Sequence, residues 1–236
     1  VVLHLGAIAS THVSQKELLY GFNTDAVRII GRACSKKNIP MVFISSSAVY
    51  GNNGKHLSLY ALSKKNAEEE LRSIKRLDFL CLRLFNTYGF DERKKGSMKS
   101  VISDMVISAL QERSVSVIKL PGIDFGSQSR DFIFVEDVCR IVSESIEQTK
   151  FTNDTVDLGS GKSYKFIEIA EEICQELQNV RIRQTGFPSG YDVSTYQLYT
   201  EANMEWTTDL KINFKPSSPR ENIPELIRQY RNVLHS

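Results

Sequence analysis

The sequence predicts an α/β fold in which a mainly parallel sheet carries helices on both faces, followed by a smaller α/β domain. Two observations support this prediction. Short apolar runs, such as 41–44 and 79–84, alternate with stretches of helical periodicity, and strands that alternate with helices form parallel sheets with both faces covered. In addition, 41% of the 236 residues are hydrophobic, which is enough for a sizeable core.

The part of the chain before Gly89 supplies the elements of this sheet. Pro40 separates the first long helix from the next strand. Apolar residues at helical spacing predict the buried face of that helix: Leu18, Leu19, Phe22, Val27, Ile29, Ile30 and Ala33. In order, we expect a buried strand over 1–5, a helix over 15–37, a buried strand over 41–44, a helix over 58–75 and a strand over 79–84.

After Gly89 the chain changes in texture, and we place a domain boundary near residue 90. Later segments are expected to cross back and complete the first domain. In order, we expect a charged loop over 91–95, a helix over 97–111, strands over 115–120 and 132–134, a helix from 136, a strand over 156–158, a helix over 166–177, a strand over 180–183 and a terminal helix over 223–233.

Composition excludes several classes of function. Thirty Lys and Arg against 28 Asp and Glu give a formal net charge of +2, and no run of like charges predicts nucleic-acid binding. No apolar run approaches the roughly 20 residues that span a bilayer. The four cysteines form no CxxC pair, so we expect no metal site, no disulfide framework and a reduced, cytoplasmic protein.

Tyr60 and Lys64 form a YxxxK pattern within the helix expected over 58–75. Residues four apart lie on one helix face, so the phenol and the ammonium can meet. A nearby cation stabilises phenolate and lowers the pKa of a tyrosine from about 10 toward that of a general base. The alternative is a tyrosine at the edge of the core beside a solvated lysine.

A run of serines, Ser45-Ser46-Ser47, follows the buried strand over 41–44. Ligands bind outside the carboxyl ends of parallel strands, so a serine here can bind a substrate hydroxyl beside Tyr60. Serine clusters are also common in turns. The serines and the YxxxK pattern together, in this order after a strand, favour a catalytic site.

These motifs resemble the extended short-chain dehydrogenase/reductases, and the resemblance covers essentially the whole chain. The matching strings are HLGA from His4, SSSAVYG from Ser45, YALSK from Tyr60, LRLFNTYG over 82–89, RDFIFVEDV over 130–138 and DLGSGKSY over 157–164. The resemblance implies a Rossmann-like dinucleotide-binding domain over 1–90, whose first βα units would precede Val1, and a substrate-binding domain over 91–236. It also implies a catalytic base at Tyr60, an assisting Lys64, and Ser46 on the substrate oxygen.

One branch of the family, the ADP-L-glycero-D-manno-heptose 6-epimerases, is the most similar. Its KGSM motif matches Lys95 to Met98, nine residues beyond Asn86. In that branch the sugar is oxidised by bound NADP and the hydride returns to its other face. The resemblance therefore makes Lys95 a second acid/base group. A lysine acts near neutral pH when it is desolvated or close to another cation, and the alternative is a solvated loop.

The resemblance also implies further contacts. Arg130 would bind the nucleotide phosphates, the alternative being a surface ion pair with Asp131 or Glu136. Asn23 would support the active site or the cofactor, the alternative being a helix residue facing solvent. Substrate contacts are implied for Ser46, Asn86, Ser97, Arg130 and Tyr196, and cofactor contacts for Gly6, Ala7, Asn23, Tyr60 and Lys64.

Two other features are interpreted as structural. Gly161-Lys162-Ser163 is similar to the end of a phosphate-binding Walker A loop, but Val156 stands where the first glycine belongs. None of the four histidines shows ligand spacing. We interpret His4, at a strand end, as a hydrogen-bonded structural histidine.

The functional hypothesis is a nucleotide-sugar epimerase that uses NADP or NAD, forms a homo-oligomer and acts on ADP-heptose. The glycine-rich turn that binds the dinucleotide is absent from this sequence, so the cofactor is inferred from the other motifs. A UDP- or dTDP-hexose 4-epimerase, dehydratase or reductase is the alternative within the family. A non-catalytic dinucleotide-binding protein is the alternative of another class.

Overall fold

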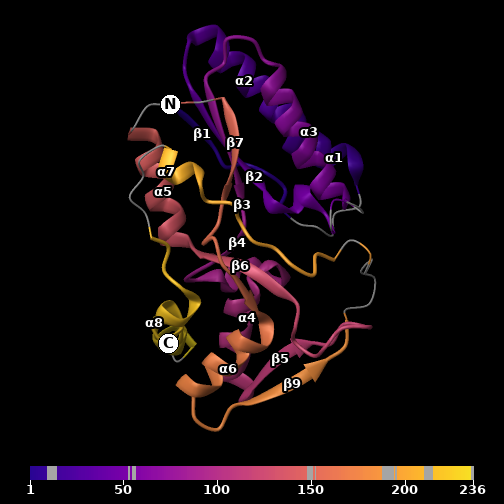
Figure 1. The fold of residues 1–236 in the computed structure, drawn as a ribbon, viewed down its shortest axis with the longest axis vertical. Helices are drawn as coiled ribbons and strands as arrows, with labels where there is room; N and C mark the ends of the chain where they lie inside the picture. Colours follow the sequence, from indigo (N-terminus) through magenta and orange to yellow (C-terminus); the bar gives the residue numbers. More distant parts are fainter. Residues whose placement is uncertain are drawn as a thin grey trace.

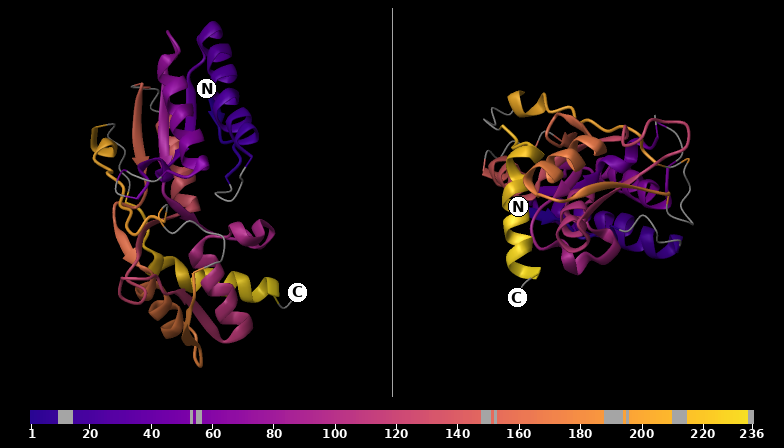
Figure 2. Two further views of the ribbon diagram at one scale, coloured as in Figure 1. Left: turned by 90° about the vertical axis from the view of Figure 1, so that its right-hand side faces the viewer. Right: turned by 90° about the horizontal axis from the view of Figure 1, so that it is seen from below.

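A computed structural model describes residues 1–9, 15–52, 54, 57–147, 151, 153–187, 194, 196–209 and 215–234. The elements form two units stacked along the long axis of the molecule (Figure 1). The N-terminus lies in the first unit and the C-terminal helix in the second, as a view from the side also shows (Figure 2).

The first unit is built on a parallel sheet with the strand order β1-β2-β3-β7. Its strands are β1 (Val2–His4), β2 (Met41–Ser46), β3 (Phe79–Leu84) and β7 (Asp154–Leu158). Helices α1 (Lys16–Tyr20), α2 (Ala26–Lys37) and α3 (Leu59–Ser73) lie on one side, and α5 (Val135–Glu147) and α7 (Trp206–Asp209) lie on the other (Figure 1). Separate apolar clusters fill the two sides of the sheet. The parallel sheet with helices on both faces confirms the predicted fold class.

Strand β1 differs from the buried strand that the sequence predicts. Among the described residues it pairs with β2 alone, and the side chains of Leu3 and Leu5 are 40% and 62% exposed. The prediction relied on apolar character. An apolar run does not reveal whether a strand has one neighbour or two.

The helix expected over 15–37 is present but is interrupted by a π-helical turn, Gly21–Asp25, between α1 and α2. Leu19 and Val27 are buried as expected, whereas Phe22 and Ile29 are 58% and 63% exposed. A π turn bonds residues five apart, so the residues before and after it do not share one straight stripe. The predicted apolar face is therefore wrong in part.

In its described residues, the second unit contains two smaller sheets and three long helices. Strand β6 (Ser129–Phe134) pairs parallel with β4 (Asn86–Tyr88) and antiparallel with β8 (Ser163–Lys165), while β5 (Ser114–Ile118) pairs parallel with β9 (Arg181–Thr185). The helices are α4 (Val101–Glu112), α6 (Phe166–Glu176) and α8 (Pro219–Leu234), and a 3₁₀ segment, Glu92–Met98, precedes α4. Their apolar faces form a core of their own.

Residues 196–203, here called the crossing segment, run where the two units meet before the chain reaches α7 (Figure 1). The backbone N–H of Ser129 donates to the carbonyl of Leu198 at 2.9 Å, and that of Thr200 donates to the carbonyl of Ser129 at 3.3 Å. The N–H of Asn203 donates to Asp157 in β7 at 3.1 Å. The crossing segment is thus bonded to strands of both units.

In the described ranges, every helix is too short or too polar to cross a membrane.

Candidate active site

The serine run forms a turn at the carboxyl end of β2. Ser46 is the last residue of the strand, and its Oγ accepts a hydrogen bond from the N–H of Ala48 at 3.2 Å, which caps the 3₁₀ turn Ser47–Tyr50. Side chains alternate along a strand, and Ser45 accordingly donates to Glu68 of α3 at 2.7 Å. The capped turn, here called the serine turn, therefore fixes Ser46 at the strand end.

Tyr60 lies in the first turn of α3, where Ser58 caps the helix by accepting from the N–H of Ala61. The Tyr60 hydroxyl lies close to Ser46. Burial raises the pKa of Tyr60 and the interaction with Ser46 lowers it, with burial the larger effect. The structure thus brings together the two residues that the sequence paired.

Lys64 is only 2% exposed and lies one helical turn beyond Tyr60. Its Nζ donates to the carbonyl of Ile44 at 2.6 Å and lies 4.3 Å from the centre of the Phe43 ring. Burial lowers the pKa of Lys64 to about 8. The alternative of a solvated lysine is therefore wrong.

The sequence also predicts that Lys64 lowers the pKa of Tyr60, but in this structure that pKa is raised. Burial acts directly on the phenol, while the Lys64 ammonium is bonded to the carbonyl of Ile44. The carbonyl of Ile44 competes with the Tyr60 phenol for the Lys64 ammonium. This competition explains why the pKa of Tyr60 is raised instead of lowered.

Glu68 is a buried carboxylate that the sequence analysis did not single out. It is 1% exposed and accepts from Arg83 at 2.9 and 2.7 Å and from Ser45 at 2.7 Å. Burial raises its pKa, but hydrogen bonds from Arg83 and Ser45 outweigh burial and hold the pKa below its usual value. Its position four residues after Lys64, on the same helix face, was the signal that could have identified it.

Arg83 extends this network to Tyr50 in the serine turn. Its Nη1 donates to the Tyr50 hydroxyl at 2.9 Å, and that hydroxyl donates to Asp157 at 2.6 Å. Burial and the bond to Asp157 raise the pKa of Tyr50 to about 12. Tyr50 is therefore a neutral structural phenol.

Asn23 lies in the π-helical turn and is 1% exposed, so the alternative of a solvent-facing residue is wrong. Its Oδ1 accepts from the N–H of Ile8 at 2.8 Å, and its Nδ2 donates to the carbonyl of Ile8 at 3.1 Å and to Ser63 at 3.0 Å. These bonds tether the exposed segment with Gly6 and Ala7, just beyond β1.

His4 ends β1, and its ring stacks on Phe43 with the centroids 5.8 Å apart. The interpretation as a fully hydrogen-bonded histidine is wrong, because its buried Nε2 has no hydrogen-bond partner among the described residues. Burial and then the charge of Lys64 lower the pKa of His4. The neutral imidazole therefore predominates near neutral pH.

Arg130 is 7% exposed, which contradicts the alternative of a surface ion pair. Its guanidinium lies 4.9 Å from the centre of the Tyr196 ring and 5.8 Å from that of Phe166, and it donates to the carbonyl of Ser129 at 2.9 Å. In the described part of the chain, no carboxylate forms an ion pair with it. A buried guanidinium in this state can bind an anion.

Asp131, the next residue, is fully buried and binds backbone N–H groups. Its oxygens accept from Ser160 at 2.6 Å, from Gly161 at 2.9 Å and from Ala202 at 3.0 Å. The turn that contains Gly161-Lys162-Ser163 therefore wraps around a carboxylate of the protein, in agreement with our exclusion of a Walker A loop.

Two of the implied substrate contacts lie at the start of the second unit. The Nδ2 of Asn86 lies 3.4 Å from both the carbonyl of Asp131 and the hydroxyl of Thr200, which are long hydrogen bonds. Ser97 lies within the 3₁₀ segment Glu92–Met98, and its side chain is outside the described structure.

Lys95 does not have the surroundings that the sequence analysis required. Its side chain is 57% exposed, and its Nζ forms an ion pair with Glu92 at 3.1 Å rather than a contact with another cation. Glu92 itself is buried and also accepts from Ser100 and Ser103. Neighbouring Arg93 is bonded instead to Asp91. In this structure Lys95 is a partly solvated, paired ammonium.

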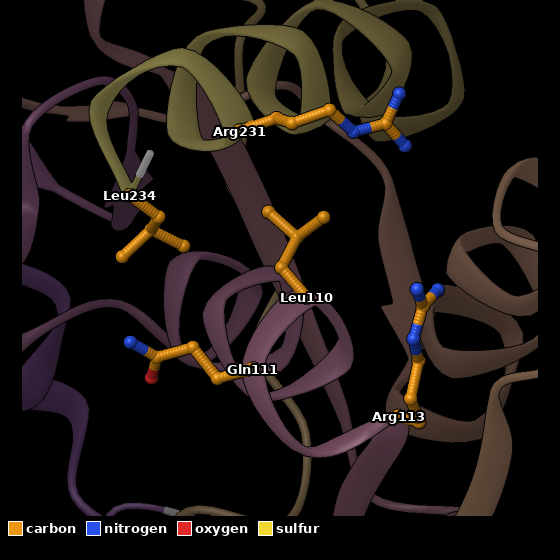
Figure 3. Close-up of a pocket in the computed structure, with 5 residues that line it drawn as sticks. All are labelled: Leu110, Gln111, Arg113, Arg231 and Leu234. Atoms are coloured by element: carbon orange, nitrogen blue, oxygen red, sulfur yellow. The ribbon is translucent and has the colours of Figure 1, made fainter. Parts of the chain in front are cut away.

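The described residues contain no cluster of His, Cys, Asp and Glu that could hold a metal ion. A cavity of about 330 Å³ lies between the ends of α4 and α8, lined by Leu110, Gln111, Arg113, Arg231 and Leu234 (Figure 3). None of the predicted site residues lines it. The candidate site therefore consists of Ser46, Tyr60 and Lys64, near the carboxyl end of β2, together with Arg130.

A family model described as the NAD dependent epimerase/dehydratase family matches residues 1–159. The chain belongs to this family. The match includes Ser46, Tyr60, Lys64 and Arg130, and it confirms the sequence-based family assignment. Residues 160–236, which include Tyr196, lie outside the matched range.

Two ADP-L-glycero-D-manno-heptose-6-epimerases are similar in sequence to this chain over most of its length. The chain is 26% identical to an ADP-L-glycero-D-manno-heptose-6-epimerase of Nitratidesulfovibrio vulgaris (strain DP4), over 97% of this chain and 76% of that protein. It is 28% identical to the enzyme of the same name from Alkalilimnicola ehrlichii, over 86% of this chain and 67% of that protein.

Solved structures of similar proteins have the same fold. A UDP-N-acetylglucosamine 4-epimerase from Methanobrevibacter ruminantium superimposes with a TM-score of 0.81 at 26% identity, over 98% of this chain and 76% of its own. The Helicobacter pylori ADP-L-glycero-D-manno-heptose-6-epimerase superimposes with a TM-score of 0.80 at 22% identity, over 99% and 72%. At that identity the second likeness shows the fold alone.

Proposed function

We propose that the protein is a nucleotide-sugar epimerase that uses NADP or NAD, and that it inverts C6 of ADP-glycero-manno-heptose by transient oxidation and re-reduction. The observation that supports this most directly is the position of Ser46 beside the hydroxyl of Tyr60, one helical turn from the buried Lys64. This is a general base, a hydrogen-bonding hydroxyl and a cation at one strand end, as oxidation of a sugar hydroxyl requires.

The proton transfer is assigned to Tyr60. Its phenolate oxygen takes the proton of the sugar hydroxyl as the hydrogen on the same carbon departs as hydride, and Ser46 holds the sugar oxygen. A bound nicotinamide dinucleotide would supply the hydride acceptor for this oxidation and the hydride donor for the re-reduction. Burial raises the pKa of Tyr60, so a phenolate needs positive charge nearby, and Lys64 is the cation on the same helix face.

The residues of the first unit fit one side of such a dinucleotide. Gly6 and Ala7 are exposed, small and tethered through Asn23 at the end of β1. Among the described residues, a Cβ added at Gly6 would approach only the ring of His4, at 3.5 Å. The protein surface at Gly6 is thus open to a ligand. We assign cofactor contacts to Gly6, Ala7, Asn23, Tyr60 and Lys64.

The anionic part of the substrate is assigned to Arg130. A guanidinium offers a fork of donors that matches phosphate oxygens, and the rings of Tyr196 and Phe166 hold this one in place. Asn86, Ser97 and Tyr196 are proposed as further substrate contacts. A diphosphate at Arg130 would direct the sugar toward the junction of the two units.

Lys95 is proposed as the acid/base group for the opposite face of the sugar. Its Nζ is bonded to Glu92 and partly exposed, and its proposed role is to donate a proton to the sugar oxygen during re-reduction. To act as a base it has to leave Glu92 and lose water, which requires a substrate that covers the segment Glu92–Met98. The Lys95 assignment therefore rests on the KGSM motif.

The experiment is to purify the full-length protein, extract any bound dinucleotide for mass spectrometry, and follow the C6 epimer ratio of ADP-D-glycero-D-manno-heptose. We expect turnover with NADP or NAD, a loss of about 10²- to 10⁴-fold with Tyr60→Phe and a clear reduction with Lys95→Met. Tyr20→Phe and Lys94→Met are matched controls, since Tyr20 contacts Lys16 and Lys94 is exposed.

Other outcomes would redirect the proposal. Turnover of UDP- or dTDP-hexoses alone would favour the alternative represented by the UDP-N-acetylglucosamine 4-epimerase fold relative. A bound dinucleotide without turnover of ADP-heptose would keep the scaffold and move the substrate to another nucleotide sugar, and the absence of any dinucleotide would favour the non-catalytic alternative. The proposed partners are a nucleotide sugar and a second copy of the chain in a cytoplasmic homo-oligomer, and light scattering would test the oligomer.

A further inference from the structure

The side chain of Gln197 joins the crossing segment to the serine turn. Its Nε2 donates to the carbonyl of Ser47 at 3.2 Å and to the carbonyl of Gly51 at 3.1 Å. These carbonyls lie at the beginning of the turn and just beyond its end, so one amide group bridges it. Ser46 immediately precedes the bridged residues.

The preceding residue, Tyr196, contacts the anion-binding arginine. Its ring lies 4.9 Å from the guanidinium of Arg130. On the other side of Gln197, the carbonyl of Leu198 accepts a hydrogen bond from the backbone N–H of Ser129, the neighbour of Arg130. Three consecutive residues of the crossing segment therefore contact both the anion-binding strand and the turn that positions Ser46.

The chemistry of an amide suits this bridge. The NH₂ group of glutamine offers two donors, and each meets one carbonyl of the serine turn. A carboxylate in the same place has no donor and would face two carbonyl oxygens. The bridge is partly buried, so losing it leaves both carbonyls dependent on water.

We infer that Gln197 is a positioning residue that couples occupancy of the anion site at Arg130 to the geometry of Ser46. Movement of the Arg130 guanidinium onto an anion moves the Tyr196 ring, and the adjacent amide carries that movement to the serine turn. The inference rests on the proposed function, because Ser46 and Arg130 are working groups only if the protein acts on a nucleotide sugar.

The test compares Gln197→Glu with Gln184→Glu in the full-length protein. Gln184 lies on the exposed strand β9, so its substitution makes the same chemical change away from the site. Two measurements are made: hydrogen exchange of residues 46–52 with and without ADP, and kcat and KM over a range of pH with the nucleotide sugar that the wild type turns over. Gln197→Ala, followed together with Tm, is the second variant should the glutamate prevent folding.

We expect ADP to slow exchange in residues 46–52 of the wild type and of Gln184→Glu but not of Gln197→Glu. Because two hydrogen bonds are lost, kcat should fall roughly tenfold with a smaller change in KM. The interaction with nearby Ser46 lowers the pKa of Tyr60, so a displaced Ser46 should also move the acidic limb of the kcat profile to higher pH. A purely structural role would lower Tm without moving this limb.

The two proposals fail in different ways. Wild-type protein that binds ADP and turns over substrate, together with a Gln197→Glu variant that matches it in exchange and in kcat, overturns the coupling alone. Wild-type protein that neither binds ADP nor turns over a nucleotide sugar overturns the proposed function, and the coupling with it.

Discussion

Replacing the carboxylate of Glu68 by an amide, Glu68→Gln, should destabilise the first unit far more than its exposure to solvent suggests. Glu68 accepts two bonds from Arg83 and one from Ser45, and Arg72 lies 3.1 Å from its Oε2. A glutamine of the same shape keeps one oxygen. Its NH₂ group would face a guanidinium, which is also a donor.

The magnitude follows from the burial of each partner. Breaking a fully buried ion pair costs about 3–5 kcal/mol. Glu68 is 1% exposed, but the side chains of Arg83 and Arg72 are 21% and 44% exposed, so water reaches the arginines. We therefore expect a loss of about 2–4 kcal/mol in the free energy of unfolding at neutral pH. For a protein of this size that is a drop in Tm of roughly 4–16 °C.

The effect should depend on pH with a defined sign. The pKa of Glu68 is lower in the folded protein than its usual value of 4.5, so the ionised carboxylate stabilises the fold above that value. The stabilisation is lost as the pH falls through the folded-state pKa. The difference between wild type and Glu68→Gln should therefore narrow once the pH is below 4.5.

The assay is urea unfolding at neutral and acidic pH, with Glu69→Gln as the control. Glu69 is the next residue on α3 and is exposed, so its substitution makes the same change outside the network. If Glu68→Gln is within about 0.5 kcal/mol of Glu69→Gln at neutral pH, a value typical of surface substitutions, the network does not stabilise the fold and the reasoning is refuted.

Two further predictions concern residues to which cofactor contacts are assigned in the proposed function. The pKa of Lys64 is lowered from 10.5 to about 8, so between these values the unfolded chain binds a proton that the folded protein does not. The unfolding free energy of the wild type should therefore rise with pH relative to Lys64→Met across this window, by roughly 3 kcal/mol in total, and a flat difference in urea titrations would contradict the assigned burial. Asn23→Leu removes three hydrogen bonds, two of them to Ile8. It should cost about 2–4 kcal/mol and weaken dinucleotide binding, whereas Asn66→Leu on α3 should do neither; equal Tm and dinucleotide affinity of the two variants would refute the tether.

The elements that depend on local sequence pattern were predicted close to their observed bounds. The strand over 79–84 has the expected bounds, and α3 begins one residue later than predicted, because Ser58 caps it. The short strands β4 and β8 were not predicted. Each has three residues and exists only by pairing with β6, and no local periodicity marks a strand that short.

The site shows the same division. Ser46 and Tyr60 are 14 positions apart on adjacent elements, and sequence alone paired them. The partners of Gln197 lie 150 and 146 positions away, so only the fold reveals the bridge. Lys95 is a third case. Its motif is visible in the sequence, but the ion pair with Glu92, three residues earlier, is not. Glu92 lies among several charged residues, and nothing in the sequence distinguishes it from them.

Both buried cations of the candidate site lack an ion-pair partner among the described residues. Lys64 and Arg130 are 2% and 7% exposed, and each is held by one backbone carbonyl and by aromatic rings. Burial lowers the pKa of both, so neither side chain is placed where it stabilises the folded protein most. By contrast, the buried carboxylate of Glu68 in the first unit is paired with Arg83. Two desolvated cations, one in each unit, are the arrangement expected where polar and anionic groups of a ligand complete the charge balance.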